Sequence, residues 1–135
     1  MPRPADNQPD LCGRIILIAE TNSLIALDLA ETIRAWGGQP LLYNELPEQQ
    51  QAVPPDEVCA ALVDMSLSHQ QHAGLIDALR QRNVPTVLTT AWQLDIIGNQ
   101  FPSMTILEKP VNYAALEQWF ADWTQCPPAR HCCSG

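Results

Sequence analysis

The sequence is poor in positive charge and lacks any long hydrophobic run. Lysine and arginine together number 7, against 15 aspartates and glutamates, which gives a formal net charge of −8 at pH 7. An acidic protein repels phosphate backbones, so autonomous binding to DNA or RNA is not expected. No stretch approaches the roughly 20 apolar residues of a membrane helix, and the first ten residues, MPRPADNQPD, contain no apolar core of a secretion signal. We therefore expect a cytoplasmic protein that binds neither nucleic acid nor membrane.

Cysteine is sparse, with 5 residues in the chain. Cys12 and Cys59 stand alone in or near apolar segments, and we interpret them as small core residues of a protein in a reducing compartment. The segment CPPARHCCSG holds the other three cysteines and one histidine: Cys126, His131, Cys132 and Cys133. Their spacing matches no standard zinc pattern, so we interpret this segment as a disordered tail rather than a metal site.

Apolar runs typical of strands alternate with segments of helical periodicity. Strands are expected at residues 14–20, 39–45, 60–65, 84–91 and 103–109. Helices are expected at residues 22–38, 74–83, 92–100 and 111–123, and the polar, proline-containing segment after the second strand allows only a short one. This alternation predicts an α/β fold, a doubly wound (βα)5 three-layer sandwich around a five-stranded parallel sheet. We expect one domain at residues 13–124, between a flexible arm at 1–12 and a tail at 125–135.

The ends of the expected helices carry recognisable capping residues. Asn22 or Ser23 can cap the first helix, which Gly37 and Gly38 can close. Asn112 is a plausible cap of the last helix. The residues expected to face the core at helical spacing are Ile25, Leu29, Ile33, Trp36, Leu75, Ile76, Leu79, Leu116, Phe120 and Trp123.

Polar side chains stand at the ends of four expected strands. They are Glu20, Thr21, Asp64, Thr89, Thr90 and Lys109. In doubly wound sheets the ligand binds at the carboxyl ends of the strands, so these residues are expected to meet at one rim. A carboxylate at the end of the apolar strand AALV is costly unless it is paired, and Lys109 or a divalent cation can neutralise Asp64. Glu20 and Asp64 offer the oxygen ligands that Mg²⁺ prefers.

Four segments in this order give a family resemblance: ILIAETNSLIALDLAETIRAWG, AALVDMSL, VPTVLTTAW and ILEKPVNYAALE. The chain resembles the receiver domain of bacterial response regulators (the CheY-like, flavodoxin-like fold) over about residues 13–124. The segment LEKP together with ALDLAET also looks like the single-domain receivers that lack an aromatic switch residue on the fifth strand. The sequence fits a stand-alone receiver and a receiver within a hybrid kinase equally.

The resemblance implies a phosphoacceptor site. Asp64 matches the aspartate that takes a phosphoryl group from the phosphohistidine of a histidine kinase or phosphotransfer protein. Lys109 matches the lysine that pairs with a phosphoryl oxygen, and Thr90 matches the switch hydroxyl. The backbone N–H of Ala91 is the expected further partner of the phosphoryl group.

The same resemblance implies a magnesium cofactor. Its expected ligands are Asp64, the backbone carbonyl of Ser66 and the acidic cluster at Glu20. The family usually has two acids after the first strand, whereas this chain has Glu20 followed by Thr21. A neutral ligand in place of a carboxylate is expected to weaken Mg²⁺ binding, because the affinity for hard ions follows ligand charge.

Two further departures concern the switch and the loop after the acceptor. The aromatic switch position on the fifth strand holds Ile106, so the usual coupling of threonine to an aromatic side chain cannot operate in its usual form. Trp92 could replace it as the mobile residue. The loop after Asp64 carries His69 and His72, which we interpret as exposed loop residues.

Three functions follow from these observations. The first is a phosphorylation switch, not an enzyme on an external substrate, that changes a surface for a downstream protein and could pair with a second copy. Trp119, beside the inward face of the last helix, is the best candidate for an exposed partner contact. The second is a pseudo-receiver, a protein-binding module independent of phosphorylation. The third, a small hydrolase or phosphotransferase, ranks last because no second general base is visible near Asp64.

Overall fold

A computed structural model of the chain describes residues 9–43, 56–65, 69–90, 105–109 and 111–125. Its strands are β1 (Ile15–Ala19), β2 (Gln39–Leu42), β3 (Val58–Asp64), β4 (Thr86–Thr90) and β5 (Thr105–Glu108). Its helices are α1 (Ser23–Ala35), α2 (His69–Gln81) and α4 (Tyr113–Gln125). The helix predicted at 92–100, with Trp92, and most of the predicted tail lie outside the described residues. None of the described helices is both long and apolar enough to cross a membrane.

The five strands form one parallel sheet in the order β2-β1-β3-β4-β5. This order confirms the predicted doubly wound fold. The chain reverses its direction of travel across the sheet between β1 and β3, because β2 is added on one side of β1 and the later strands on the other. Ligands bind at such a switch point, outside the carboxyl ends of the strands. A ligand site is therefore expected at the residues that end β1 and β3.

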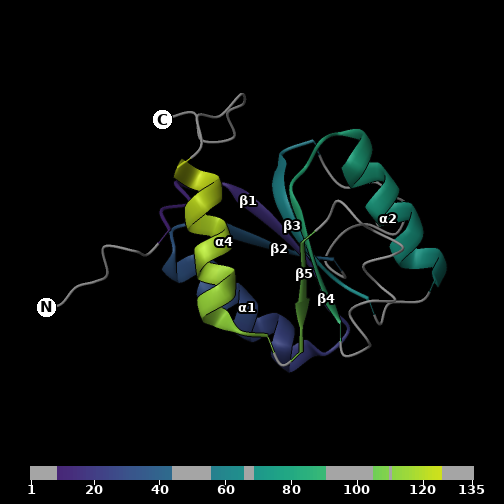
Figure 1. Cartoon of the computed structure of the whole chain (residues 1–135), viewed down its shortest axis with the longest axis horizontal. Coiled ribbons are helices and arrows are strands. Elements are labelled where there is room, and N and C mark those ends of the chain that lie inside the picture. Colours follow the sequence, from purple (N-terminus) through teal and green to yellow (C-terminus); the bar gives the residue numbers. More distant parts are fainter. Residues whose placement is uncertain (1–8, 44–55, 66–68, 91–104, 110, 126–135) are drawn as a thin grey trace, which may run out of the picture.

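Helices cover both faces of the sheet (Figure 1). On one face, α1 and α4 pack on alternate residues of the strands, among them Ile16, Ile18 and Leu62. On the other face, α2 packs on the intervening residues, such as Leu17 and Val63. Every residue of β3 is buried, as expected for a central parallel strand between two helical layers. The ten predicted inward residues all belong to or pack against these two clusters.

The ends of α1 follow the predicted capping pattern. The side chain of Asn22 accepts hydrogen bonds from the N–H groups of Leu24 and Ile25 at 2.9 and 3.2 Å. At the other end Gly37 has a φ of +87°, which a residue with a Cβ rarely adopts. A Cβ on Gly38 would lie 2.8 Å from the Leu11 side chain. The two glycines therefore end the helix and let it approach the chain before β1.

Helix α2 begins earlier than the sequence pattern predicts. The expected start was Gly74, but the helix runs from His69 and so includes His72. The prediction that these two histidines belong to a loop is therefore wrong. Gly74 is exposed, and a Cβ at this position would meet no atom within 4 Å. Its weak helix propensity, about 1 kcal/mol relative to alanine, does not interrupt the helix.

The chain before β1 is packed rather than loose near residue 11. Leu11 is fully buried, and its N–H donates to the carbonyl of Trp36 at 2.8 Å. Leu11 therefore packs with the core although it precedes residue 13. The interpretation of Cys12 as a core residue is wrong, because Cys12 is exposed, whereas Cys59 is buried. Both are disulfide-bonded rather than free thiols.

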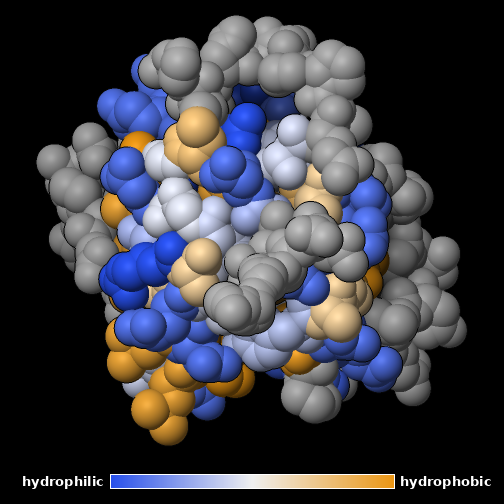
Figure 2. All heavy atoms as spheres, turned by 90° about the vertical axis from the view of Figure 1, so that its left-hand side faces the viewer, coloured by the Kyte–Doolittle hydropathy of each residue, from blue (hydrophilic) through white to orange (hydrophobic). Residues whose placement is uncertain are grey.

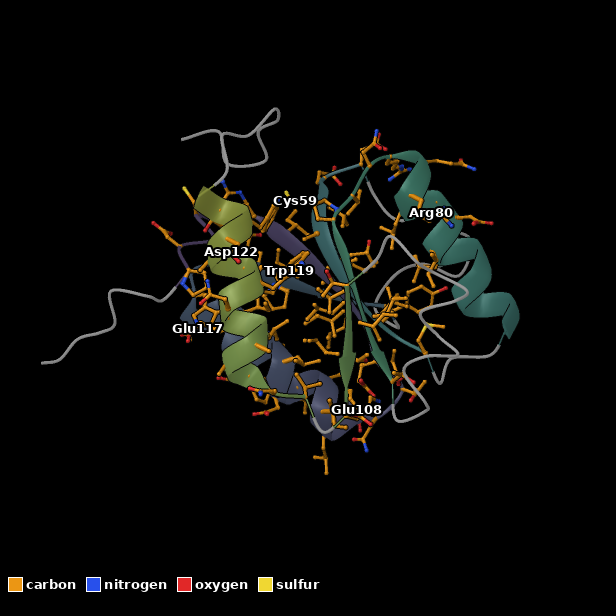
Figure 3. All side chains as sticks on the ribbon, viewed as in Figure 1. Cys59, Arg80, Glu108, Glu117, Trp119 and Asp122 are labelled. Atoms are coloured by element: carbon orange, nitrogen blue, oxygen red, sulfur yellow. The ribbon has the colours of Figure 1, made fainter. Side chains whose placement is uncertain are left out.

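Helix α4 packs its aromatic residues against the core cluster that it shares with α1. Asn112 caps it as predicted, accepting from the N–H groups of Ala114 and Ala115 at 2.9 and 3.2 Å. Phe120 is fully buried and lies 4.9 Å, centroid to centroid, from Trp119. Trp119 was predicted as an exposed partner contact, but it is partly buried against the core and lies between α4 and the sheet (Figure 3).

Candidate functional site

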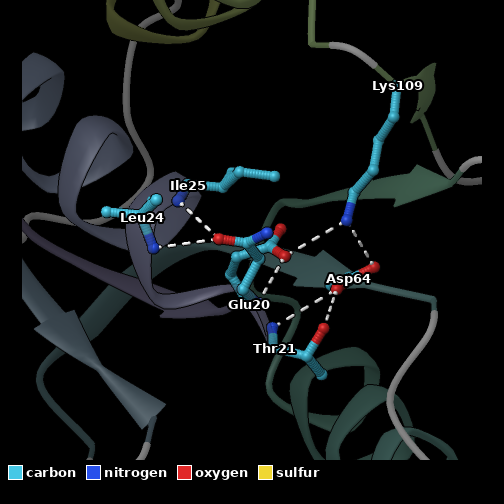
Figure 4. Close-up of polar contacts among 7 residues, drawn as sticks. Glu20, Thr21, Leu24, Ile25, Asp64 and Lys109 are labelled. Carbon is cyan, nitrogen blue, oxygen red and sulfur yellow. Dashed lines mark hydrogen bonds and ion pairs between the residues drawn. The ribbon is translucent and has the colours of Figure 1, made fainter.

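Three charged side chains meet at the carboxyl ends of the strands (Figure 4). Asp64 ends β3, Glu20 follows β1 and Lys109 follows β5. The Lys109 ammonium lies 3.0 Å from Oδ1 of Asp64 and 3.1 Å from Oε2 of Glu20. One cation is therefore shared between two carboxylates that come from distant parts of the chain. Lys109 is also the only lysine of the sequence.

Thr21 completes the contacts around Asp64. Its hydroxyl donates to Oδ2 of Asp64 at 2.9 Å, and its backbone N–H donates to the same oxygen at 3.3 Å. Each oxygen of the Asp64 carboxylate thus receives a donor of its own, the ammonium on Oδ1 and the threonine on Oδ2. These contacts explain how a carboxylate with 1% of its side chain exposed is tolerated at the end of an apolar strand.

The start of α1 holds Glu20 and Thr21 in position. The N–H of Asn22 donates to Oε2 of Glu20 at 3.0 Å, while the side chain of Asn22 caps the helix. The same residue therefore fixes the helix start and the acid that precedes it. On the other side, the N–H of Lys109 donates to the carbonyl of Thr90 at 2.7 Å, which anchors the end of β5 to β4.

The site holds more acidic groups than basic ones. Two carboxylates face one ammonium, and the Glu20 side chain is only 2% exposed. Burial raises the pKa of Glu20, and the neighbouring Asp64 charge adds to this effect. Burial lowers the pKa of Lys109, but its contacts with Asp64 and Glu20 outweigh burial and raise that pKa overall. The lysine is thus held charged, and it faces two carboxylates, of which Glu20 has the raised pKa.

The chain is similar in structure to solved receiver domains. The receiver domain of the sensor histidine kinase PA1611 from Pseudomonas aeruginosa PAO1, with magnesium in its active-site cleft, matches with a TM-score of 0.66 and 24% identity over 84% of this chain and 99% of that one. The BeF3-activated SdrG of Pseudomonas melonis matches with a TM-score of 0.59 and 22% identity over 79% and 96%.

A third match is the receiver domain of Saccharomyces cerevisiae Ssk1, solved together with the histidine phosphotransfer protein Ypd1. It has a TM-score of 0.63 and 18% identity over 87% of this chain and 90% of that one. The chain has the fold of a response-regulator receiver domain. No protein-family model matches this receiver-fold chain, and no curated protein matches it.

The site at the strand ends suits a hard divalent cation through Glu20 and Asp64. Oε1 of Glu20 is buried and accepts no hydrogen bond from any of the described residues. A buried carboxylate oxygen without a donor, in a site with a second carboxylate, is suited to a cation such as Mg²⁺. Among the described ranges no cluster of three or more histidine, cysteine or acidic residues is present, so carboxylate ligation rests on these two acids. Ser66, the third predicted ligand, lies outside those ranges.

The predicted switch residues lie at the end of β4. Thr90 is fully buried, and the strand register pairs Asp64 with Thr89 rather than with Thr90. Because neighbouring strand residues face opposite sides of a sheet, Thr89 shares the face of Asp64, and the Thr90 side chain starts from the other face. Ala91 lies outside the described residues. Ile106, at the position usually aromatic, packs against the cluster under α2.

A hydrogen bond between α1 and α4, near the site, was not predicted from the sequence. The hydroxyl of Tyr113, at the start of α4, donates to Oδ2 of Asp28 on α1 at 2.6 Å. Burial, then this hydrogen bond, raises the pKa of Tyr113 well above its ordinary value. The only available signal was the position of the tyrosine directly after the Asn112 cap, four residues beyond Lys109.

Proposed function

We propose that this chain is a receiver that accepts a phosphoryl group on Asp64 and thereby changes a protein-binding surface. The observation that carries the proposal is the Lys109 ammonium placed between Asp64 and Glu20 at the switch point of a receiver fold. Such an ammonium can follow a phosphoryl oxygen, because its flexible stem lets it move away from the carboxylate. Apolar side chains in place of these three charged groups would stabilise the fold at least as well, so their presence favours a functional role.

The transfer needs no redox partner, and the one proton it needs is carried on the second ring nitrogen of the phosphohistidine, so that the histidine leaves as a neutral imidazole. A carboxylate oxygen of Asp64 attacks phosphorus in line, forming an O–P bond as the N–P bond of a phosphohistidine breaks and the imidazole leaves with the electron pair. The product is an acyl phosphate on Asp64. The Lys109 ammonium would neutralise part of the charge on the phosphoryl oxygens.

Magnesium would be held by Glu20 and Asp64, with the Ser66 carbonyl as a further expected ligand. When bound, it shields the negative charges of the carboxylates and phosphate from each other. Glu20 keeps its unpartnered Oε1 in the site for this role. Thr21 adds no formal charge where the family usually has an acid, so we expect a requirement for higher Mg²⁺ concentrations.

A hydrophobic surface for a phosphotransfer partner adjoins the site. Leu24 and Leu27 on α1 are exposed to 76% and 54%, and no other large hydrophobic residue among the described ones is as open. Figure 2, which faces the side of α1 and α4, shows hydrophobic atoms gathered at its lower edge. Ssk1, which shares the fold, was solved with a phosphotransfer protein. A helical partner that packs on these leucines would bring its phosphohistidine towards Asp64.

The output of the switch would pass through Thr90. Phosphate on Asp64 is expected to draw the Thr90 hydroxyl and the Ala91 N–H towards the phosphoryl oxygens, which requires the end of β4 to rearrange. Turnover of an external substrate is not part of this function. The downstream protein, pairing between copies and a cytoplasmic location stay predictions.

The test is phosphorylation with acetyl phosphate and Mg²⁺, followed by intact mass measurement and peptide mapping. We expect the mass of one phosphoryl group on Asp64 in the wild-type chain and none in an Asp64→Asn variant. A wild-type chain that stays unmodified, while a control receiver is labelled under the same conditions, contradicts the proposal.

A pseudo-receiver is the second candidate, and one observation favours it. Both oxygens of Asp64 are already engaged by protein donors, Oδ1 by Lys109 and Oδ2 by Thr21. A site that satisfies its own carboxylate in this way can serve as a constant binding module. The two candidates differ in the same mass experiment, because a pseudo-receiver gains no phosphoryl group at any donor concentration.

A further inference from the structure

We propose that Thr21 restrains the phosphoacceptor, so that its hydroxyl slows phosphorylation of Asp64. This inference rests on the proposed function. It concerns the residue at which this chain departs from the two-acid pattern and gives that residue a positive role, rather than only the loss of a metal ligand.

Oδ2 of Asp64 is already occupied by two donors from Thr21. This oxygen accepts the Thr21 hydroxyl at 2.9 Å and the Thr21 N–H at 3.3 Å. During phosphoryl transfer the charge on the attacking carboxylate falls as the O–P bond forms. A donor on the carboxylate therefore stabilises the reactant more than the transition state, which raises the barrier. The hydroxyl is the shorter of the two contacts and the one that a substitution can remove.

The two side chains that donate to Asp64, Lys109 and Thr21, differ in how freely they can move away from it. Lys109 reaches Oδ1 through a flexible four-carbon stem, and a phosphoryl group can draw its ammonium away from the carboxylate. Thr21 has no such freedom, because it directly precedes Asn22, whose side chain caps α1 and whose N–H is bonded to Glu20. The backbone N–H contact of Thr21 is therefore fixed. The hydroxyl contact is lost only when the Thr21 side chain rotates away from Asp64.

Thr21 is exposed, whereas Asp64, which it contacts through Oδ2, is buried. A substitution at this exposed position changes few packing contacts. Valine keeps the shape and the N–H of threonine but lacks the hydroxyl, and serine keeps the hydroxyl but lacks the methyl group.

The experiment compares the full-length wild-type chain with Thr21→Val and Thr21→Ser. Phosphorylation by acetyl phosphate is followed by intact mass over a range of Mg²⁺ concentrations, which separates the rate at saturating Mg²⁺ from the Mg²⁺ concentration for half that rate. We expect Thr21→Val to raise the saturated rate roughly 10-fold to 100-fold, the equivalent of one hydrogen bond to a charged group. Thr21→Ser is expected to stay close to wild type, and melting curves check that all three chains are folded.

The outcomes separate this inference from the proposed function. Faster labelling of Thr21→Val than of a wild-type chain that is itself labelled supports the restraint. Labelling of Thr21→Val alone overturns the acceptor function of the wild-type chain, on which the restraint rests. A wild-type chain that is labelled as fast as Thr21→Val, or faster, overturns the restraint and leaves the acceptor function standing. A change confined to the Mg²⁺ requirement makes Thr21 a metal-site residue and also overturns it. If no chain is labelled while a control receiver is, the acceptor function and the restraint both fail.

Discussion

Replacing Lys109 with methionine removes the ammonium that Asp64 and Glu20 share while keeping most of the aliphatic stem. The two carboxylates have exposed side-chain fractions of 1% and 2%, so they would lose their cation in a poorly solvated place. Removing one partner of a buried ion pair costs about 3–5 kcal/mol. Because Lys109 itself is 17% exposed, we take the lower end, about 3 kcal/mol.

The expected loss is large enough to measure by thermal unfolding. With an unfolding entropy of about 2.1 cal/mol/K per residue, a chain of 135 residues converts this cost into a fall in melting temperature of roughly 10 °C. The fall should be smaller at pH 5 than at pH 7.5. The carboxylates of the variant would have raised pKa values and take up protons at lower pH, which removes the repulsion that destabilises the folded state.

The matched control is Arg34→Met, which breaks an ion pair between Arg34 and Glu31. That pair is longer, at 3.6 Å, and its side chains are 57% and 78% exposed. Its loss should change stability by at most about 0.5 kcal/mol, which is roughly 2 °C. If Lys109→Met melts as little below wild type as Arg34→Met does, at both pH values, the lysine does not compensate two buried acids and the reasoning is refuted.

Three other predictions concern pH, metal and oxidation. Burial raises the pKa of both tyrosines, Tyr43 and Tyr113, so folded protein at pH 10 should show little of the phenolate absorbance of an unfolded control. The free energy of unfolding should then fall as pH rises above 10, since the folded state favours the neutral phenols. Half-ionised tyrosines in folded protein at pH 10 would contradict the raised pKa values. Mg²⁺ should raise the melting temperature of wild type but not of Glu20→Gln, and equal increases would exclude Glu20 as a ligand. Thiol alkylation in denaturant should label Cys12 and Cys59 only after reduction, and peptide mapping of unreduced protein that finds both labelled would rule out their disulfides.

The strand ends explain why much of the site could be predicted from the sequence. An apolar run that ends in an acid or a lysine indicates both a buried strand and the edge at which its polar residue lies. Parallel strands end at a common edge, so Glu20, Asp64 and Lys109 had to converge once the fold was known. The capping residues Asn22 and Asn112 were readable for a similar reason, since they act on neighbours within three positions.

What escaped prediction depends on contacts between segments that are distant in the chain. The hydrogen bond from Thr21 to Asp64 joins residues 43 positions apart and requires one side-chain rotamer. Leu11 was assigned to an arm because its neighbours are polar, and only the approach of the α1 end gives it a place in the core. Neither disulfide-bonded cysteine could be recognised, since sequence spacing does not reveal which sulfur atoms meet. Figure 3 places Cys59 at the end of the sheet away from Glu108, near the start of the strand that Asp64 ends.

A partly buried amine that is the sole lysine of a chain has a practical consequence. Any reagent or modifying enzyme that targets lysine side chains can react only with Lys109 in this sequence, and its ammonium lies between Glu20 and Asp64. Acetylation of Lys109 would remove the positive charge, and coupling to a solid support through lysine would place the matrix at the carboxyl ends of the strands. Assays that need immobilised or dye-labelled protein should therefore attach it through another chemistry.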